Sequence, residues 1–134
     1  MARTAPPLRL DYQPMSTASR GSGRERQVVR LLQADGWFAM RAPASLGVAD
    51  VVALRAGGLE FRDDGGDELV MMQRSEARLI EVKTTATRGP WNDFGPAARR
   101  ALSEAALLAG ATAWLYHWPT GGQLRVIPEA EWPT

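Results

Sequence analysis

The sequence predicts a single α/β domain with a mixed central β-sheet flanked by helices. Its 134 residues correspond to about one domain, and 45% of them are apolar, which is enough to form a buried core. Segments with helical and with strand periodicity follow one another in the order helix, three or four strands, helix, two strands.

Residues 22–36 carry the signals of the first helix. Ser22 and Glu25 match a capping box, with Ser22 as the N-cap and Glu25 at the third helical position. Gly36 stands where a glycine commonly follows a helix end. The expected apolar face consists of Val28, Leu31 and Leu32. Residues 1–20 show no periodicity, and we expect them to form a flexible arm ahead of a domain that spans 21–134.

The first strands are expected between 37 and 84. Segment 48–54 predicts an apolar strand that only Asp50 interrupts, and segment 78–84 predicts a second buried strand. The other strand candidates are 37–41 and 69–73, and the expected connections are a turn at 43–47 and an exposed loop at 57–66.

The C-terminal part predicts a helix followed by a strand hairpin. Pro96 suits the first turn of a helix, and Gly110 suits its end. The expected apolar face of this helix comprises Ala98, Ala101, Leu102, Ala105, Leu108 and Ala109. In the next strand, 112–118, the aromatic residues Trp114, Tyr116 and Trp118 alternate with Leu115 and His117. A turn at 119–122 then leads into a strand at 124–127.

The composition excludes several kinds of site. The chain has no cysteine, so it has no disulfide, zinc–thiolate site or cysteine nucleophile. Its one histidine, His117, cannot form a cluster of imidazole ligands, and we assign it no catalytic role. No apolar stretch approaches the ~18 residues of a membrane helix, and the N-terminus lacks a signal-peptide core. We expect a cytoplasmic protein, associated with the nucleoid and of cellular or phage origin.

The net charge of +1 conceals an uneven distribution. Residues 1–41 contain seven arginines and three acidic residues, a net charge of +4, whereas residues 56–77 have a net charge of −4. A basic N-terminal part suits a polyanionic partner. Of the sixteen cationic residues only Lys83 is a lysine, which suggests that an arginine would not serve at this position.

Two acidic residues and this lysine stand out against apolar surroundings. Asp50 interrupts one predicted strand, and Glu81 lies in the middle of another. Glu81 and Lys83 are two residues apart and therefore share one face of their strand. Burial of such charges is unfavourable unless they are paired or bind a metal ion.

This pattern suits metal-assisted hydrolysis of a phosphodiester. Mg²⁺ prefers oxygen ligands and commonly takes one or two carboxylates together with water and a substrate phosphate. Asp50 and Glu81 would supply the carboxylates, and Mn²⁺ would substitute for Mg²⁺. Lys83 would orient or help deprotonate the attacking water, or offset charge on the phosphate. Glu25 would complete the site through water or a second metal ion.

An ordered set of these residues resembles the archaeal-type Holliday junction resolvases of the PD-(D/E)XK nuclease superfamily. The set consists of Gly21, Glu25, Arg26, Arg41, Ser45, the run Gly47-Val48-Ala49-Asp50 and the run Glu81-Val82-Lys83. The resemblance extends from Gly21 to about Ile127. The isolated Glu-x-Lys is a weak signal, whereas the ordered set is much more specific.

The resemblance implies a restriction-endonuclease-like fold and a homodimeric, Mg²⁺-dependent endonuclease that nicks four-way DNA junctions symmetrically. It implies metal or water ligation by Glu25, Asp50, Glu81 and the Val82 carbonyl, and catalytic roles for Lys83 and Ser45. It also implies that Arg24, Arg26 and Arg41 contact the DNA backbone, and that Ser45 contacts or orients the backbone phosphate.

The sequence departs from the family in two respects. Glu81 follows Asp50 by 31 residues because the acidic segment 57–77 intervenes. This segment is expected to form a hairpin that lies away from DNA phosphates. The family also tends to be rich in lysine, whereas arginine must line the DNA-facing surface here.

Simpler interpretations compete with these assignments. Glu25 could serve only as a capping residue, Ser45 as a turn residue, and Arg26 and Arg41 as ordinary surface residues. The aromatic residues of 114–118 fit core packing or, with Leu102 and Leu108, a dimer surface better than a platform on which bases stack. The same site would also serve a restriction-like or repair nuclease acting on duplex DNA. A DNA-binding module on a nuclease fold that has lost activity is a third alternative.

Overall fold

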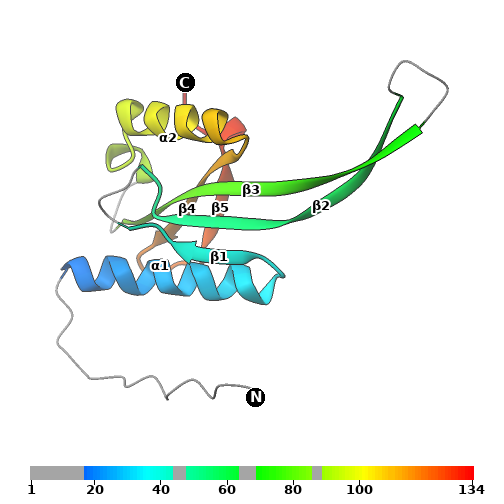
Figure 1. Ribbon diagram of the computed structural model, residues 1–134. Coiled ribbons are helices and arrows are strands. Elements are labelled where there is room, and N and C mark those ends of the chain that lie inside the picture. Colours follow the sequence, from blue (N-terminus) through cyan, green and yellow to red (C-terminus); the bar gives the residue numbers. More distant parts are fainter. Residues whose placement is uncertain (1–16, 44–47, 64–68, 86–88) are drawn as a thin grey trace, which may run out of the picture.

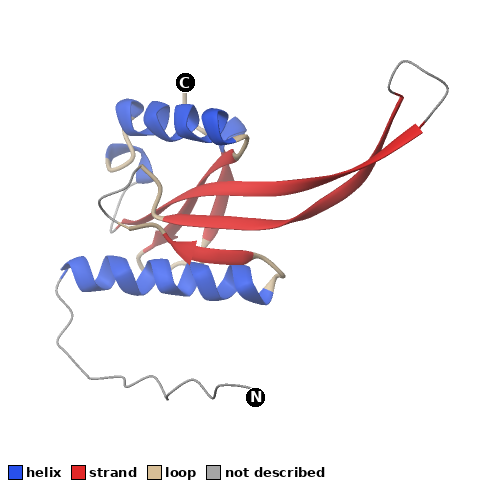
Figure 2. Cartoon of the chain, viewed as in Figure 1, coloured by secondary structure: helices blue, strands red, loops and turns tan. Residues whose placement is uncertain are grey.

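The computed structural model describes residues 17–43, 48–63, 69–85 and 89–134, which form a five-stranded sheet with a long helix on each face (Figures 1 and 2). The elements in chain order are α1 (Thr17–Ala34), β1 (Phe38–Arg41), β2 (Val51–Asp63), β3 (Leu69–Thr85), the 3-10 helix η1 (Pro90–Asn92), α2 (Pro96–Ala109), β4 (Thr112–Pro119), β5 (Arg125–Pro128) and the 3-10 helix η2 (Glu129–Glu131). This element order confirms the predicted mixed α/β architecture.

The sheet follows the chain order β1-β2-β3-β4-β5. Neighbouring strands are antiparallel except β3 and β4, which run parallel because α2 crosses between them. In the parallel pair Glu81 lies beside Leu115, and Lys83 lies beside His117. Glu81 therefore has β4 on one side, whereas the pairing of β3 with β2 on the other side ends one residue earlier, at Ile80 and Val51.

Each face of the sheet has its own hydrophobic core. On the α1 side, Val28 and Leu32 of the helix pack with Val51 and Ile80 of the central strands. The α2 side has a second group, formed by Phe94, Leu102, Ala106, Ala113, Leu115 and Ile127. Because side chains alternate along a strand, Ile80 faces α1 whereas its neighbours Leu79 and Glu81 face the other side.

The first helix begins earlier than its capping signal predicts. Helix α1 starts at Thr17, within the segment expected to be an arm, so Ser22 lies inside the helix and not at its N-cap. A capping motif is only a local preference, and it does not prevent a helix from continuing in the N-terminal direction. Val28 and Leu32 are buried as expected, but Leu31 is half exposed. Gly36 has a φ of 89°, which confirms its place just after the helix end.

Strands β2 and β3 form a hairpin much longer than predicted. The expected loop at 57–66 is wrong over 57–63, where β2 continues to Asp63, and its residues 64–66 lie outside the described part of the chain. The candidates 69–73 and 78–84 are parts of one strand, β3. The predicted hairpin at 57–77 is confirmed, with an irregularity between Ala56 and Leu59. It extends well beyond the other strands (Figure 1). The expected strand from 48 begins only at Val51, so Asp50 precedes it.

Helix α2 and strand β4 agree with the sequence in position but differ in burial. Pro96 opens α2, and Gly110 has a φ of 65° at its end. Leu102 is fully buried as expected, but Leu108, which was expected on the same apolar face, is 90% exposed. The stripe Trp114, Tyr116 and Trp118 packs against the α1-side core. Burial therefore removes much of the dimer surface expected from this stripe and from Leu102.

None of the helices in the described part of the chain is long and apolar enough to cross a membrane. The expected turn at 43–47 falls mainly on residues outside this part.

Candidate active site

Asp50 is held against β3 through both its backbone and its side chain. Its backbone N–H donates to the Ile80 carbonyl at 2.9 Å, and its Oδ2 accepts a hydrogen bond from the Val82 N–H at 2.8 Å. The Ala42 N–H in turn donates to the Asp50 carbonyl at 2.8 Å. These three bonds fix the residue ahead of β2 at the level of Glu81, although the two acids are far apart in sequence.

Glu81 and Lys83 lie on the same face of β3, as their spacing predicts. The Lys83 Nζ and the Glu81 Oε1 form an ion pair of 2.9 Å. The Glu81 side chain is only 13% exposed and that of Lys83 is 29% exposed. The structure thus brings Asp50, Glu81 and Lys83 together in a partly buried cluster.

The surroundings of Glu81 disfavour its ionised form. The pKa of Glu81 is raised from 4.5 to about 7, mainly by burial and then by the negative charge of Asp50, although Lys83 opposes both effects. Burial disfavours the charge of Lys83, but its hydrogen bond with Glu81 and the nearby acids outweigh this, so the pKa of Lys83 is raised. One of the nearby acids is Asp93, at the end of η1, which the sequence did not indicate.

Glu25 stands apart from this cluster. Its Oε2 accepts a hydrogen bond from the Arg41 Nε at 3.0 Å, which joins α1 to β1. Among the described residues no group of three or more His, Asp or Glu side chains is arranged to hold a metal ion. Because α1 starts at Thr17, Glu25 also lies too far into the helix to act as a capping residue.

The remaining predicted DNA contacts are dispersed. Arg24 donates to Gln27 at 3.0 Å and lies 4.3 Å from the ring centre of Trp118. Arg26 is exposed on α1. Ser45 lies outside the described residues.

His117, to which we assigned no catalytic role, is buried and hydrogen-bonded to Thr85 at 2.5 Å, and burial lowers its pKa.

A group of stacked arginines and tryptophans, which the sequence did not indicate, lies on the opposite face of the sheet. Arg78 lies 3.7 Å from the ring centre of Trp114 and 4.6 Å from that of Trp37. Strand alternation places Arg78 on the α1 side, but the packing depends on Trp37, 41 residues earlier. No local signal in the sequence indicates this group.

The fold and the cluster together define an α/β domain with a partly buried Asp–Glu–Lys site at the centre of its sheet. A family model described as archaeal Holliday junction resolvase (Hjc) matches residues 16–63. The structure of Archaeoglobus fulgidus Hjc, a Holliday junction resolvase from an archaeal hyperthermophile, is similar with a TM-score of 0.56 and 20% sequence identity. The similarity covers 84% of this chain and 75% of that one. No curated protein sequence matches the chain.

These findings confirm the resemblance to the archaeal Holliday junction resolvases. The matched segment contains Glu25, Arg26, Arg41 and Asp50, whereas Glu81 and Lys83 lie beyond it. The structural similarity extends the shared fold over most of the chain.

The raised pKa of Glu81 predicts how stability depends on pH. In the unfolded chain this carboxyl group loses its proton near pH 4.5, but in the folded protein it keeps the proton until about pH 7. Between these values the folded state binds more protons, so the contribution of Glu81 to stability decreases as pH rises.

We therefore expect the melting temperature of the wild type, relative to Glu81→Gln, to decrease between pH 5 and pH 8 when measured in EDTA. Glu104→Gln, at an exposed position on α2, is the control and should show no such trend. A difference between wild type and Glu81→Gln that stays constant over this range would contradict the assignment.

Proposed function

We propose that the protein is a metal-dependent, structure-selective endonuclease that resolves four-way DNA junctions by paired, symmetric nicks. The observation that carries this proposal is the cluster of Asp50, Glu81 and Lys83, positioned by the hydrogen bond from the Val82 N–H to Asp50. Similarity to the resolvases over 16–63 supports branched DNA as the substrate.

The cluster fits a hard divalent cation. Mg²⁺ commonly takes only one or two carboxylates, with water and a substrate phosphate as its other ligands. Asp50, Glu81 and the Val82 carbonyl would hold it, and Mn²⁺ would substitute. The bound cation would lower the pKa of water and offset negative charge on the phosphate.

The other residues would position the substrate and the proton donors. Lys83, close to Glu81, would orient the attacking water or steady charge on the phosphate. Glu25 fixes the Arg41 side chain, so the pair would present a guanidinium to the DNA backbone. A direct metal-ligand role for Glu25 has less support than its pairing with Arg41. Arg24, Arg26 and Ser45 would add backbone contacts, as the resemblance implies.

A nicking assay tests this proposal. With Mg²⁺ or Mn²⁺ the protein should nick a labelled four-way junction at two symmetric sites, whereas a linear duplex of the same sequence should be cut much less. Asp50→Asn should abolish cleavage but leave junction affinity near the wild-type value, because DNA binding depends mainly on arginine–phosphate contacts. Glu104→Gln, at an exposed position on α2, is the matched control.

Full activity in EDTA would contradict the metal dependence. Equal cleavage of junction and duplex would favour the alternative of a restriction-like or repair nuclease. If the protein binds the junction but cleaves neither substrate, it is a DNA-binding module.

Lys83 gives a second prediction. Lys83→Arg keeps the positive charge but changes its size, donor geometry and pKa, so we expect the cleavage rate to decrease by at least about a hundredfold. Single-turnover rates at saturating protein measure this, and Arg100→Lys on α2 is the control for the same exchange at an exposed position. A rate for Lys83→Arg within twofold of the wild type would show that only the charge of Lys83 matters.

Symmetry predicts a homodimer. A four-way junction is two-fold symmetric and needs two opposed nicks, whereas each chain holds one cluster. A C2 dimer is the commonest oligomer and would supply two sites. Light scattering should give twice the chain mass of 14.6 kDa. A monomer at the concentrations that cleave junctions would contradict this arrangement.

A further inference from the structure

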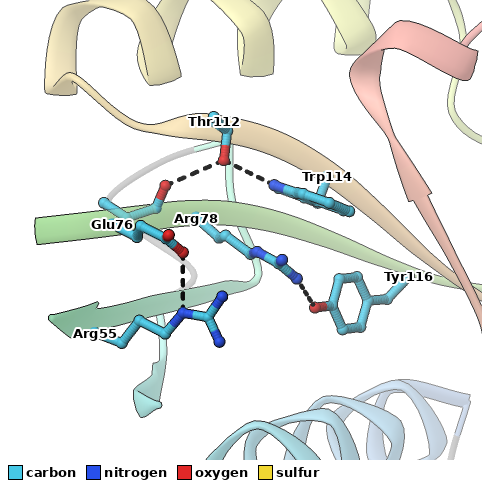
Figure 3. A network of polar contacts seen from close by, with 7 residues as sticks. Arg55, Glu76, Arg78, Thr112, Trp114 and Tyr116 are labelled. Atoms are coloured by element: carbon cyan, nitrogen blue, oxygen red, sulfur yellow. Dashed lines mark hydrogen bonds and ion pairs between the residues drawn. The ribbon is translucent and has the colours of Figure 1, made fainter. Parts of the chain in front are cut away.

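The stacked arginines and tryptophans line a pocket that the proposed reaction does not use. The pocket lies where the long hairpin leaves the sheet and has a cavity volume of about 470 Å³. Its lining includes Trp37, Gly58, Glu76, Arg78, Thr112 and Trp114. Figure 3 shows how the polar groups of β2, β3 and β4 converge here.

The tryptophan rings that line this pocket have arginine guanidinium groups stacked on them, one from the lining residue Arg78 and one from Arg55 beside the pocket. Arg55 lies 4.1 Å from the ring centre of Trp37, and Arg78 lies 4.6 Å from it. Arg78 also lies 3.7 Å from the ring centre of Trp114. The Trp114 ring is itself fixed, because its Nε1–H donates to the Thr112 hydroxyl at 2.7 Å. The arginine and tryptophan side chains are thus held in place before a ligand binds.

The two arginines differ in their partners. Arg55 pairs with Glu76 at 2.9 Å, so its charge is balanced. The Arg78 Nη1 donates to the Tyr116 hydroxyl at 2.9 Å, and within the described part of the chain Arg78 has no carboxylate partner. A guanidinium has five N–H donors, so a partly buried Arg78 can still bind an anion.

An anion next to an aromatic wall matches the chemistry of a nucleotide. The guanidinium fork fits the oxygens of a phosphate, and a tryptophan ring provides a surface on which a base can stack. Gly57 and Gly58 at the rim carry no side chain that would block a backbone or a flat ring.

We propose that this pocket binds a nucleotide unit of the DNA, with its phosphate on Arg78 and its base against Trp114, in an arm of the junction other than the one being cut. This inference rests on the proposed junction-cleaving function. Arg78 and Glu81 are separated by about 10 Å of strand but face opposite sides of the sheet. A linear duplex that lies across the cluster would not reach the opposite face, whereas a four-way junction has further arms.

The same face carries a second contact of this kind. Trp118, two positions beyond Tyr116 on the same side of β4, has the Arg24 guanidinium 4.3 Å from its ring centre. Arg24 is also among the residues expected to contact DNA from the sequence. A row of arginine and tryptophan side chains therefore follows β4 from Trp114 to Trp118, about 13 Å along the strand.

Binding measurements test the pocket separately from cleavage. With Ca²⁺ in place of Mg²⁺, the affinity of each variant for a fluorescent four-way junction is compared with that for a linear duplex of the same sequence. Arg78→Gln should weaken junction binding about tenfold and duplex binding less than twofold. The slope of log K against log salt for the junction should decrease by about one, because one phosphate contact is lost.

Further variants separate a DNA contact from damage to the fold. Arg78→Lys keeps the charge and should preserve the salt slope, whereas Trp114→Phe should weaken junction binding without changing the slope. Arg100→Gln removes the same charge from an exposed position on α2 and should change neither affinity by more than twofold. Circular dichroism confirms that each variant is folded.

Unchanged junction affinity in both Arg78→Gln and Trp114→Phe would overturn the proposal, as would an equal loss for junction and duplex. A deoxynucleoside monophosphate that quenches tryptophan fluorescence at micromolar concentration in the wild type but not in Arg78→Gln would assign the pocket to a free nucleotide instead. The pocket is tested by the binding affinities of the variants relative to the wild type. Failure of the wild type to cleave junctions would instead overturn the proposed function and leave the binding result in place.

Discussion

The hydrogen bond from the Val82 N–H to the Asp50 carboxylate is the interaction on which the site depends. At 2.8 Å it joins the segment ahead of β2 to the middle of β3, although 32 residues separate its partners. It places one acid beside another in a partly buried environment, and the charge of Asp50 then helps raise the pKa of Glu81 to about 7. Because the charge of Asp50 disfavours ionisation of Glu81, a divalent cation shared by the two carboxylates would stabilise the ionised form of Glu81.

The two faces of the sheet carry different kinds of functional side chain. The acidic cluster lies with Glu81 and Lys83 on the α2 side, while the arginine and tryptophan side chains lie on the α1 side. A compact domain that acts on a branched substrate can use both faces, because the arms of a junction leave the branch point in different directions. The fold shared with the A. fulgidus resolvase is compatible with this arrangement.

The sequence predicted features whose causes are local or periodic. Pro96 and Gly36 marked helix ends because their backbone preferences are strong, and the spacing of Glu81 and Lys83 placed them on one strand face. Tertiary packing decided the rest. The partner of Glu25 depends on the contact of α1 with β1, where Arg41 lies sixteen positions further along the chain. The length of the β2–β3 hairpin could not be predicted from the sequence, because two consecutive glycines, Gly57 and Gly58, are typical of a loop. In the structure they lie within β2, at an irregularity in its pairing with β3.

We propose that Asp50 and Glu81 hold one divalent cation beside the Val82 backbone. Anomalous diffraction from crystals soaked in Mn²⁺ tests it most directly, because the ion is located without reference to activity. We expect an anomalous peak at roughly 2–2.5 Å from a carboxylate oxygen of each acid and from the Val82 carbonyl, and no peak there in Asp50→Asn crystals. A wild-type crystal that binds Mn²⁺ elsewhere, or not at all, would contradict the account.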